Sequence, residues 1–168
     1  MAVKDVLLLG NEKLREKSSP VSDLSSDRNL KIQRDLKDTL NNLQEIYGLG
    51  RALAAPQIGY NKKIIFFNFK DNSFYMINPK ITGANDETFE VWDSCFSFEL
   101  AFFVKIPRNK AIEVEYIDEK GLEQNTKVEG DKSELYQHEI DHLDGTLAVD
   151  HLESSKNIIM RQEWEKTS

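Results

Sequence analysis

The sequence has little cysteine, no long apolar run near its start and no excess of positive charge, and each shortage excludes a class of protein. Its 168 residues contain one cysteine, Cys95, which cannot form an internal disulfide, so a disulfide-stapled secreted domain is excluded. The apolar run Val6–Leu9 is too short for a secretory signal or a membrane span. We therefore expect a cytoplasmic protein with no membrane partner.

Charge and composition narrow the choice further. Lys and Arg number 22 against 29 Asp and Glu, a net charge of −7 that disfavours extended contact with phosphate backbones and predicts no direct DNA binding. Hydrophobic residues make up 39% of a chain whose length suits one domain with its own core. The four prolines are scattered and no repeat stands out, so we expect a single domain over residues 1–168.

Helical and strand-like segments alternate in blocks along the chain. Apolar residues at helical spacing predict a helix over Asp27–Tyr47, with Ser25, Ser26 and Asp27 as candidate N-caps and Gly48 as the stop. Further helices are expected over Ser133–Leu143 and Ser155–Trp164. The strand-like runs between them are Lys62–Phe69, Ser73–Ile81, Ala101–Ile106, Ala111–Asp118 and Leu122–Val128, the last two forming a hairpin. This grouping favours an α+β fold with an antiparallel sheet.

The sharpest chemical signal is the segment from His138 to His142. Two histidines at i and i+4 lie one above the other on a helix and can share a metal, and Glu139 between them can reach a water on that metal. The alternative is a chance motif on a solvated helix face. The apolar stripe of this segment comprises Tyr136, Ile140, Leu143 and Leu147. Both histidines lie nearly opposite the stripe, so they face either solvent or a second packed layer.

A catalytic metal needs three protein ligands and an open position. Cys95 is the natural candidate for the third ligand, although a lone cysteine is also common as a small buried hydrophobe. His151 has no partner at ligand spacing and is interpreted as a surface residue or a support for a ligand.

A loop of small residues, Gly50–Gly59, follows the first expected helix. Small side chains let a ligand approach the backbone, and Gln57 could donate a hydrogen bond to an oxyanion. Loops of this kind also serve close packing alone.

Taken together and in this order, three segments resemble the motifs of the peptide deformylases: a glycine-rich loop ending in Ala-Pro-Gln, a segment around a cysteine, and a Gln-His-Glu helix. They are Gly50–Gln57, Asp93–Ser97 and Gln137–Leu143. The resemblance extends to Leu14-Arg15, Asn78-Pro79 and Ile106-Pro107-Arg108, and so covers most of the chain. An unrelated peptidase with an HExxH helix would leave the loop and the cysteine unexplained.

This resemblance implies a fold in which antiparallel sheets pack around the central helix, with an N-terminal and a C-terminal helix. It implies that Cys95, His138 and His142 bind one divalent metal, Fe(II) first and Zn(II), Ni(II) or Co(II) as alternatives. Glu139 would be the general base and then the acid. Gln57 and the backbone N–H of Phe96 would form the oxyanion hole.

The implied reaction removes the N-formyl group from the first residue, usually methionine, of a nascent polypeptide and releases formate. Formylated nascent peptides would be the substrates, and the ribosome a transient partner. The alternative is a family member with altered specificity or lost catalysis that binds peptides or another protein. Glu139 distinguishes the two, because a binding module has no need of a general base.

The sequence departs from the family pattern around the site. Ala52, Asp93, Ser94 and Phe96 replace the usual residues of two motifs, and Asp93 is expected to pair with Arg108.

The resemblance implies that five positions contact the first substrate residue: Arg51, Ala52, Ser94, Glu134 and Leu135. Arg51 and Glu134, with Asp131 nearby, bring charge to a pocket that in the family usually takes methionine. Either this charge lines the pocket, or Arg51 and Glu134 point outward or pair at the rim and leave Leu135 and Phe98 to contact the substrate.

The segment Lys156–Ser168 is close to neutral and gives no strong electrostatic docking signal. Its large apolar residues, Ile158, Ile159, Met160 and Trp164, are expected to pack on the body of the domain.

Overall fold

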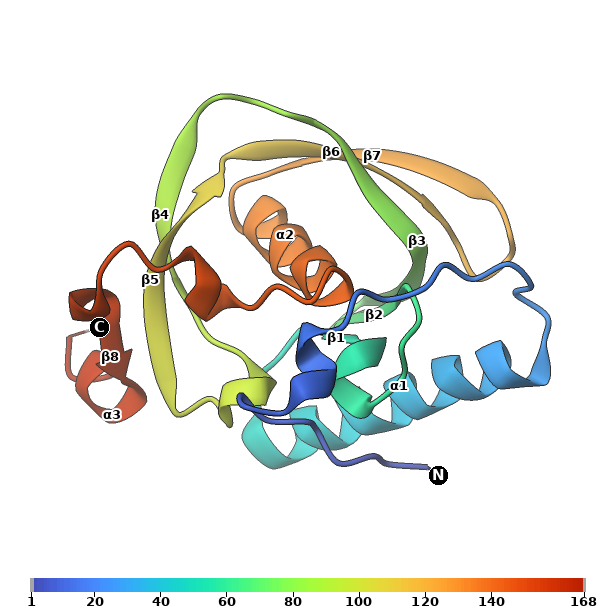
Figure 1. Cartoon of the computed structure of the whole chain (residues 1–168), viewed down its shortest axis with the longest axis horizontal. Coiled ribbons are helices and arrows are strands. Elements are labelled where there is room, and N and C mark those ends of the chain that lie inside the picture. The colour runs from blue at the N-terminus through green and yellow to red at the C-terminus, as the bar shows by residue number, and fades with distance from the viewer. Residues whose placement is uncertain (1, 168) are drawn as a thin grey trace.

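A computed structural model describes residues 2–167 and shows two antiparallel sheets with a helix between them (Figure 1). The five-stranded sheet has the order β1-β2-β3-β6-β7 and the three-stranded sheet the order β4-β5-β8. The strands of the first sheet are β1 (Ala52–Ala54), β2 (Ile64–Phe69), β3 (Asn72–Ala84), β6 (Ala111–Ile117) and β7 (Glu123–Glu129). Those of the second are β4 (Thr88–Asp93), β5 (Phe102–Asn109) and β8 (Ile158–Met160).

Three α-helices accompany the sheets: α1 (Asp27–Tyr47), α2 (Asp131–Leu143) and α3 (Arg161–Trp164). The short 3₁₀ helices are η1 (Glu12–Arg15), η2 (Ala55–Ile58), η3 (Phe96–Phe98), η4 (Ala148–His151) and η5 (Ser155–Asn157). The predicted α+β class, with an N-terminal helix, a central histidine-bearing helix and a short C-terminal helix, is confirmed. Within residues 2–167, no helix is long and apolar enough to cross a membrane.

Helix α1 has the limits that its sequence predicts. The Ser26 side chain accepts a hydrogen bond from the Asn29 N–H, and Gly48 ends the helix in a left-handed conformation with φ 66°. The apolar part of its buried face consists of Ile32, Leu36 and Leu40, which pack in one core cluster with residues of β2. The helix is therefore held by its caps and by an apolar stripe.

Helix α2 is buried on both sides. Tyr136, Ile140 and Leu143 pack into the core of the five-stranded sheet, as the stripe predicts; Leu147 is also buried but lies beyond the end of the helix. The opposite side, with His138 and His142, faces the turn after β4, so the histidines face a second packed layer rather than solvent.

Side chains also fix α2 to the end of β5. The Gln137 amide accepts from the Asn109 N–H at 3.0 Å and donates to the Asn109 carbonyl at 2.9 Å. The Ser133 hydroxyl donates to the same carbonyl at 2.8 Å. These bonds connect the helix of the histidines with the three-stranded sheet.

The helix expected over Ser155–Trp164 is present only in its last four residues, so its predicted extent is wrong. The segment divides into η5, β8 and α3, and β8 pairs with β5 in the register Phe102↔Met160. An apolar run of three residues beside an open strand edge gains ladder hydrogen bonds that a short helix cannot match. The strand β1 was also not expected, because its Ala-Leu-Ala sequence is typical of a small-residue loop, and neither was β4.

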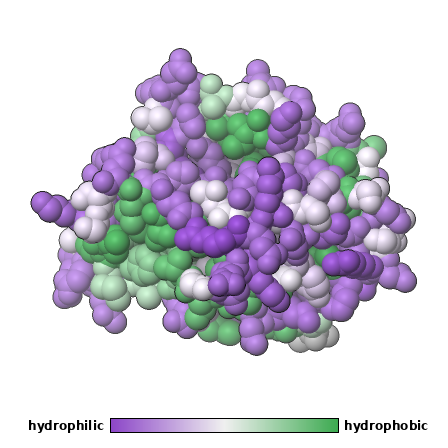
Figure 2. All heavy atoms as spheres, in the orientation of Figure 1, coloured by the Kyte–Doolittle hydropathy of each residue, from purple (hydrophilic) through white to green (hydrophobic). Residues whose placement is uncertain are grey.

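The expected packing of the C-terminal segment is correct only in part. Trp164 stacks on Phe103 with ring centroids 4.4 Å apart. Ile158 and Met160, by contrast, are 44% and 52% exposed. Figure 2 shows a mainly hydrophilic face on which hydrophobic residues gather on the side of the three-stranded sheet.

Candidate active site

Three side chains that can ligate a metal meet where the turn after β4 approaches α2. His142 Nε2 lies 3.3 Å from Cys95 Sγ and 3.2 Å from His138 Nε2, and the three ligand atoms lie within 4.8 Å of one another. All three residues are buried. A thiolate and two imidazoles that turn their lone pairs toward one point are a donor set for a divalent transition metal. The group therefore fits a metal ion.

Electrostatics set the two histidines apart. Burial, together with the nearby charge of His138, lowers the pKa of His142 to about 3, so its imidazole is neutral and able to ligate. Burial also acts to lower the pKa of His138, but the neighbouring Asp93 carboxylate outweighs it and raises that pKa well above its ordinary value.

A buried network of charges stands behind His138. Its Nδ1 lies 2.8 Å from Asp93 Oδ2, which leaves Nε2 to face the other ligands. Asp93 accepts from Arg108 Nη2 at 3.1 Å, so the predicted pair is confirmed, and Arg108 Nη1 donates to Asp141 at 2.5 Å. Burial acts to raise the pKa of Asp93, but His138 and Arg108 outweigh it and lower the pKa. Hydrogen bonds of this kind fix the ring orientation of a ligating histidine.

His151 lies at the outer end of the same network. Its Nε2 is 2.8 Å from Asp141 Oδ2 and 3.4 Å from Arg108 Nη1. It lies outside the group of ligands and supports it from a distance. The link through Asp141 was not predicted, because sequence spacing does not show which strand faces the helix.

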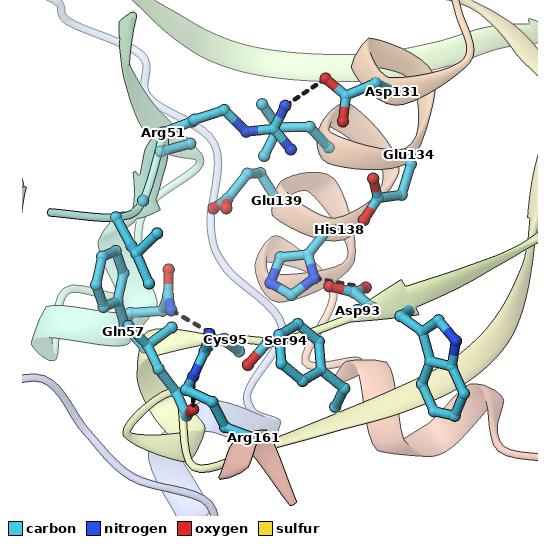
Figure 3. Close-up of a pocket in the computed structure, with 18 of the residues that line it drawn as sticks. Arg51, Gln57, Asp93, Ser94, Cys95, Asp131, Glu134, His138, Glu139 and Arg161 are labelled. Atoms are coloured by element: carbon cyan, nitrogen blue, oxygen red, sulfur yellow. Dashed lines mark hydrogen bonds and ion pairs between the residues drawn. The ribbon is translucent and has the colours of Figure 1, made fainter. Parts of the chain in front are cut away.

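Glu139 points its carboxylate into the space beside the ligands (Figure 3). The side chain is buried, and among the described residues Oε2 has no hydrogen-bond partner. Burial raises the pKa of Glu139 to about 7, against the opposing effect of His138. A buried carboxyl with a free oxygen and such a pKa can exchange a proton near neutrality.

Gln57 and Phe96 border the ligands on the other side. Gln57 Oε1 accepts from the Ala54 N–H at 2.9 Å, which orients the amide so that Nε2 faces Cys95 Sγ at 3.4 Å. Phe96 follows Cys95 directly, and its ring lies where a Cβ on Gly50 would stand, 2.2 Å from that position. Gly50 also has φ 98°, so this position requires glycine.

Cys95, His138, Glu139, Gln57 and Phe96 line one cavity of about 390 Å³, whereas His142 is buried and is not part of its lining. Of the positions expected to contact substrate, all five line it: Arg51, Ala52, Ser94, Glu134 and Leu135. Sequence reasoning missed four other lining residues from β4, β5 and α3, namely Trp92, Phe103, Arg161 and Trp164. The position of Trp92, three residues before the cysteine, was a usable signal; the C-terminal residues gave none.

Of the two alternatives for the pocket, the structure agrees with the first, in which the charged side chains line it. Arg51 forms its ion pair with Asp131, not with Glu134. The reason is that Asp131 begins α2 at the exposed mouth of the cavity, whereas Glu134 lies one turn deeper. Phe98 does not line the cavity but stacks on Phe102, with ring centroids 4.7 Å apart. The Ser94 hydroxyl donates to the Phe102 carbonyl at 2.8 Å and supports this turn.

A helix with two histidines, a cysteine ligand from a neighbouring turn and an unpartnered buried carboxylate beside them are the parts that metal-assisted hydrolysis needs. The fold and the site therefore define a metal-dependent hydrolase.

Comparison with known proteins gives the same class and a family. The sequence model of the family described as polypeptide deformylase matches residues 3–157. Peptide deformylase 2 of Clostridium perfringens is 36% identical over 161 residues, which cover 95% of this chain and 99% of the relative. The chain belongs to the peptide deformylase family.

Solved structures of peptide deformylases have the same fold as this chain. A peptide deformylase of Synechococcus elongatus in complex with actinonin superposes with a TM-score of 0.84 at 30% identity, covering 94% of this chain and 82% of that one. A class I type b peptide deformylase of Acinetobacter baumannii with Met-Ala-Ser bound has a TM-score of 0.79 at 25% identity, covering 90% and 100%.

Proposed function

We propose that this protein removes the formyl group from the first residue of N-formylated peptides, formyl-methionyl peptides among them, and releases formate. The observation that carries the proposal is the buried Glu139 carboxylate, which has a free oxygen beside Cys95, His138 and His142. The Acinetobacter relative is solved with Met-Ala-Ser bound, a peptide that begins with methionine.

Cys95, His138 and His142 would hold one divalent metal, for which we propose Fe(II), with Zn(II), Ni(II) or Co(II) as substitutes. When bound, such an ion supplies a Lewis acid that lowers the pKa of water towards neutrality. Asp93 holds His138 by Nδ1 and so keeps its Nε2 directed at the ion.

The chain's own groups then move the proton and stabilise the charge. Glu139 takes a proton from the attacking water as the oxygen bonds to the formyl carbon. Gln57 Nε2 and the Phe96 N–H donate hydrogen bonds to the oxyanion that develops on the formyl oxygen. Glu139 returns the proton to the amide nitrogen as the carbon–nitrogen bond breaks, which leaves formate and a free amine.

The test is formate release from formyl-Met-Ala-Ser by Glu139→Ala. The variant should keep its metal content and fold and lose roughly 10²- to 10⁴-fold in turnover, the usual contribution of a general acid–base group. Glu115→Ala, on the exposed side of β6, is the matched control and should retain full activity. Retained activity in Glu139→Ala would refute the assigned role.

The other candidate, a binding module without catalysis, would bind the peptide and the metal but release no formate in the wild-type protein. The presence of Glu139 disfavours this candidate, because a buried carboxyl oxygen without a hydrogen bond destabilises the folded state and a protein that only binds has no use for it.

We further propose that the whole chain acts as one domain, in the cytoplasm, on nascent polypeptides. The ribosome would then be a transient partner, because a nascent chain still carries its formyl group as it leaves the ribosome. Co-sedimentation with ribosomes that carry nascent chains would test this contact.

A further inference from the structure

The α2 wall of the cavity carries an acidic side chain, Glu134, that lies near cationic groups but is not paired with them. Arg51, Asp131 and Glu134 all line the cavity, and Figure 3 shows Glu134 on α2 between Asp131 and His138. Arg51 forms its ion pair with Asp131, and both Arg51 and His138 attract the Glu134 carboxylate without contacting it in an ion pair. Among the residues that the structure describes, the Glu134 carboxylate has neither a hydrogen-bond partner nor an ion pair. The wall therefore presents to any occupant one carboxyl group whose hydrogen-bonding capacity is unused.

This carboxylate is also poorly hydrated. Burial raises the pKa of Glu134 to about 7, and the negative charge of Asp93 acts in the same direction, against the opposing effects of His138 and Arg51. A group in this position is stabilised by any ligand atom that donates a hydrogen bond to it, and most by a cationic one. An apolar ligand that covered it would remove its remaining water without donating a hydrogen bond in its place.

Glu134 lies within reach of the first side chain of a peptide whose formyl group is at the three ligand residues. Glu134 precedes His138 by four residues, one helical turn of about 5.4 Å, on the same side of α2. In a formylated peptide the first α-carbon is two bonds from the formyl carbon, through bonds of about 1.3 and 1.5 Å. A long side chain on that α-carbon thus spans the distance from the ligand group to Glu134.

The opposite wall is less suited to accept that side chain. It is formed by Phe103, Arg161 and Trp164, whose side chains contact one another. The Arg161 guanidinium lies 4.6 Å from the Phe103 ring centroid, and Phe103 stacks on Trp164. The Arg161 guanidinium already contacts an aromatic ring, whereas the Glu134 carboxyl group on the α2 wall has no hydrogen-bond partner among the described residues.

We propose that Glu134 is a specificity-determining residue that selects N-formylated substrates whose first side chain donates a hydrogen bond, with a cationic side chain such as lysine preferred to methionine. The inference rests on the proposed deformylase activity and names the substrate class of that same cavity.

The test compares four peptides, formyl-Xaa-Ala-Ser with Xaa as Lys, Gln, Met or norleucine. Gln and Met have similar length, and norleucine has no polar atom, so the series separates charge, hydrogen bonding and size. At neutral pH we expect kcat/KM to fall from Lys through Gln to Met and norleucine, with roughly 5- to 100-fold between Lys and Met.

Two substitutions should change this order in different ways. Glu134→Leu should reverse the preference, and Glu134→Gln should lose the preference for Lys while it retains Gln over norleucine. Glu115→Leu makes the same change on exposed β6 and should leave the order as in the wild type. Melting temperature and metal content of each variant show that the fold and the ligands are retained.

Calorimetry with the unformylated peptides Lys-Ala-Ser and Met-Ala-Ser adds a readout that needs no turnover. Tighter binding of Lys-Ala-Ser, lost in Glu134→Leu, supports the inference. A wild-type preference for formyl-Met that Glu134→Leu leaves unchanged overturns the inference and leaves the deformylase activity standing. If the metal-loaded protein releases formate from none of the peptides, the proposed function fails, and the binding preference alone decides the role of Glu134.

Discussion

The buried pair Asp93–Arg108 and the surface pair Glu90–Lys105 join the same two strands, β4 and β5, and should differ sharply in their effect on stability. The Asp93 and Arg108 side chains are 4% and 3% exposed, against 58% and 36% for Glu90 and Lys105. Breaking a buried pair by removal of one charge costs about 3–5 kcal/mol. Because Asp141 still faces Arg108 at 2.5 Å, we expect Asp93→Asn to lower the free energy of unfolding by about 2–4 kcal/mol.

Glu90→Gln is the matched control and should cost at most about 1 kcal/mol, the value of an exposed pair. The assay is urea unfolding of the metal-free proteins, so that metal binding does not contribute. Asp93→Asn should also weaken metal binding by roughly 10- to 100-fold, because His138 loses the carboxylate that orients it. Competition with a chelator measures this loss. Equal unfolding free energies for the two variants, with unchanged metal affinity, would refute the role of the network.

Three further predictions follow from other parts of the structure. Gly50→Ala should lower both stability, by about 1–3 kcal/mol, and turnover, because the backbone has φ 98° and the new Cβ would displace the Phe96 ring; thermal unfolding and formate release measure the two effects. Burial acts to raise the pKa of Asp35, but hydrogen bonds from Lys31 and Tyr60 outweigh it and lower the pKa below 3.8. Its contribution to stability is thus present above about pH 4 and lost as the pH falls below that value. Asp35→Asn should flatten the acid limb of a stability–pH curve, and an unchanged limb would contradict the assignment. Removal of the metal by a chelator should abolish formate release reversibly and lower the melting temperature, since metal that binds only the folded state stabilises it.

The sequence predicts best the features that depend on local spacing. The ends of α1 follow from Ser26 and Gly48, which act at their own positions whatever the rest of the chain does. The two faces of α2 follow in the same way from a period of 3.6 residues, and this is why the histidines could be separated from the core stripe.

Features that depend on contacts between distant segments are predicted poorly. The strand β8 exists because the edge of β5 is available to it, and no property of Ile158–Met160 alone reveals that edge. The partner of Arg51 is decided by depth in the cavity: Asp131 and Glu134 are both acidic and lie three residues apart, yet only Asp131 lies at the mouth. The pair of Asp93 with Arg108 could be predicted, because both positions belong to motifs of the family that the sequence resembles.

Helix α2 carries two of the three ligand residues, His138 and His142, together with Glu134, and the two functions can be changed separately. Gln137 fixes the helix to the end of β5, and the stripe around Ile140 fixes it to the five-stranded sheet. A substitution at Glu134 alters only a side chain that faces the cavity, so the backbone that positions His138 has no reason to move. Substrate preference can therefore change through this single turn while the group that holds the metal stays as it is.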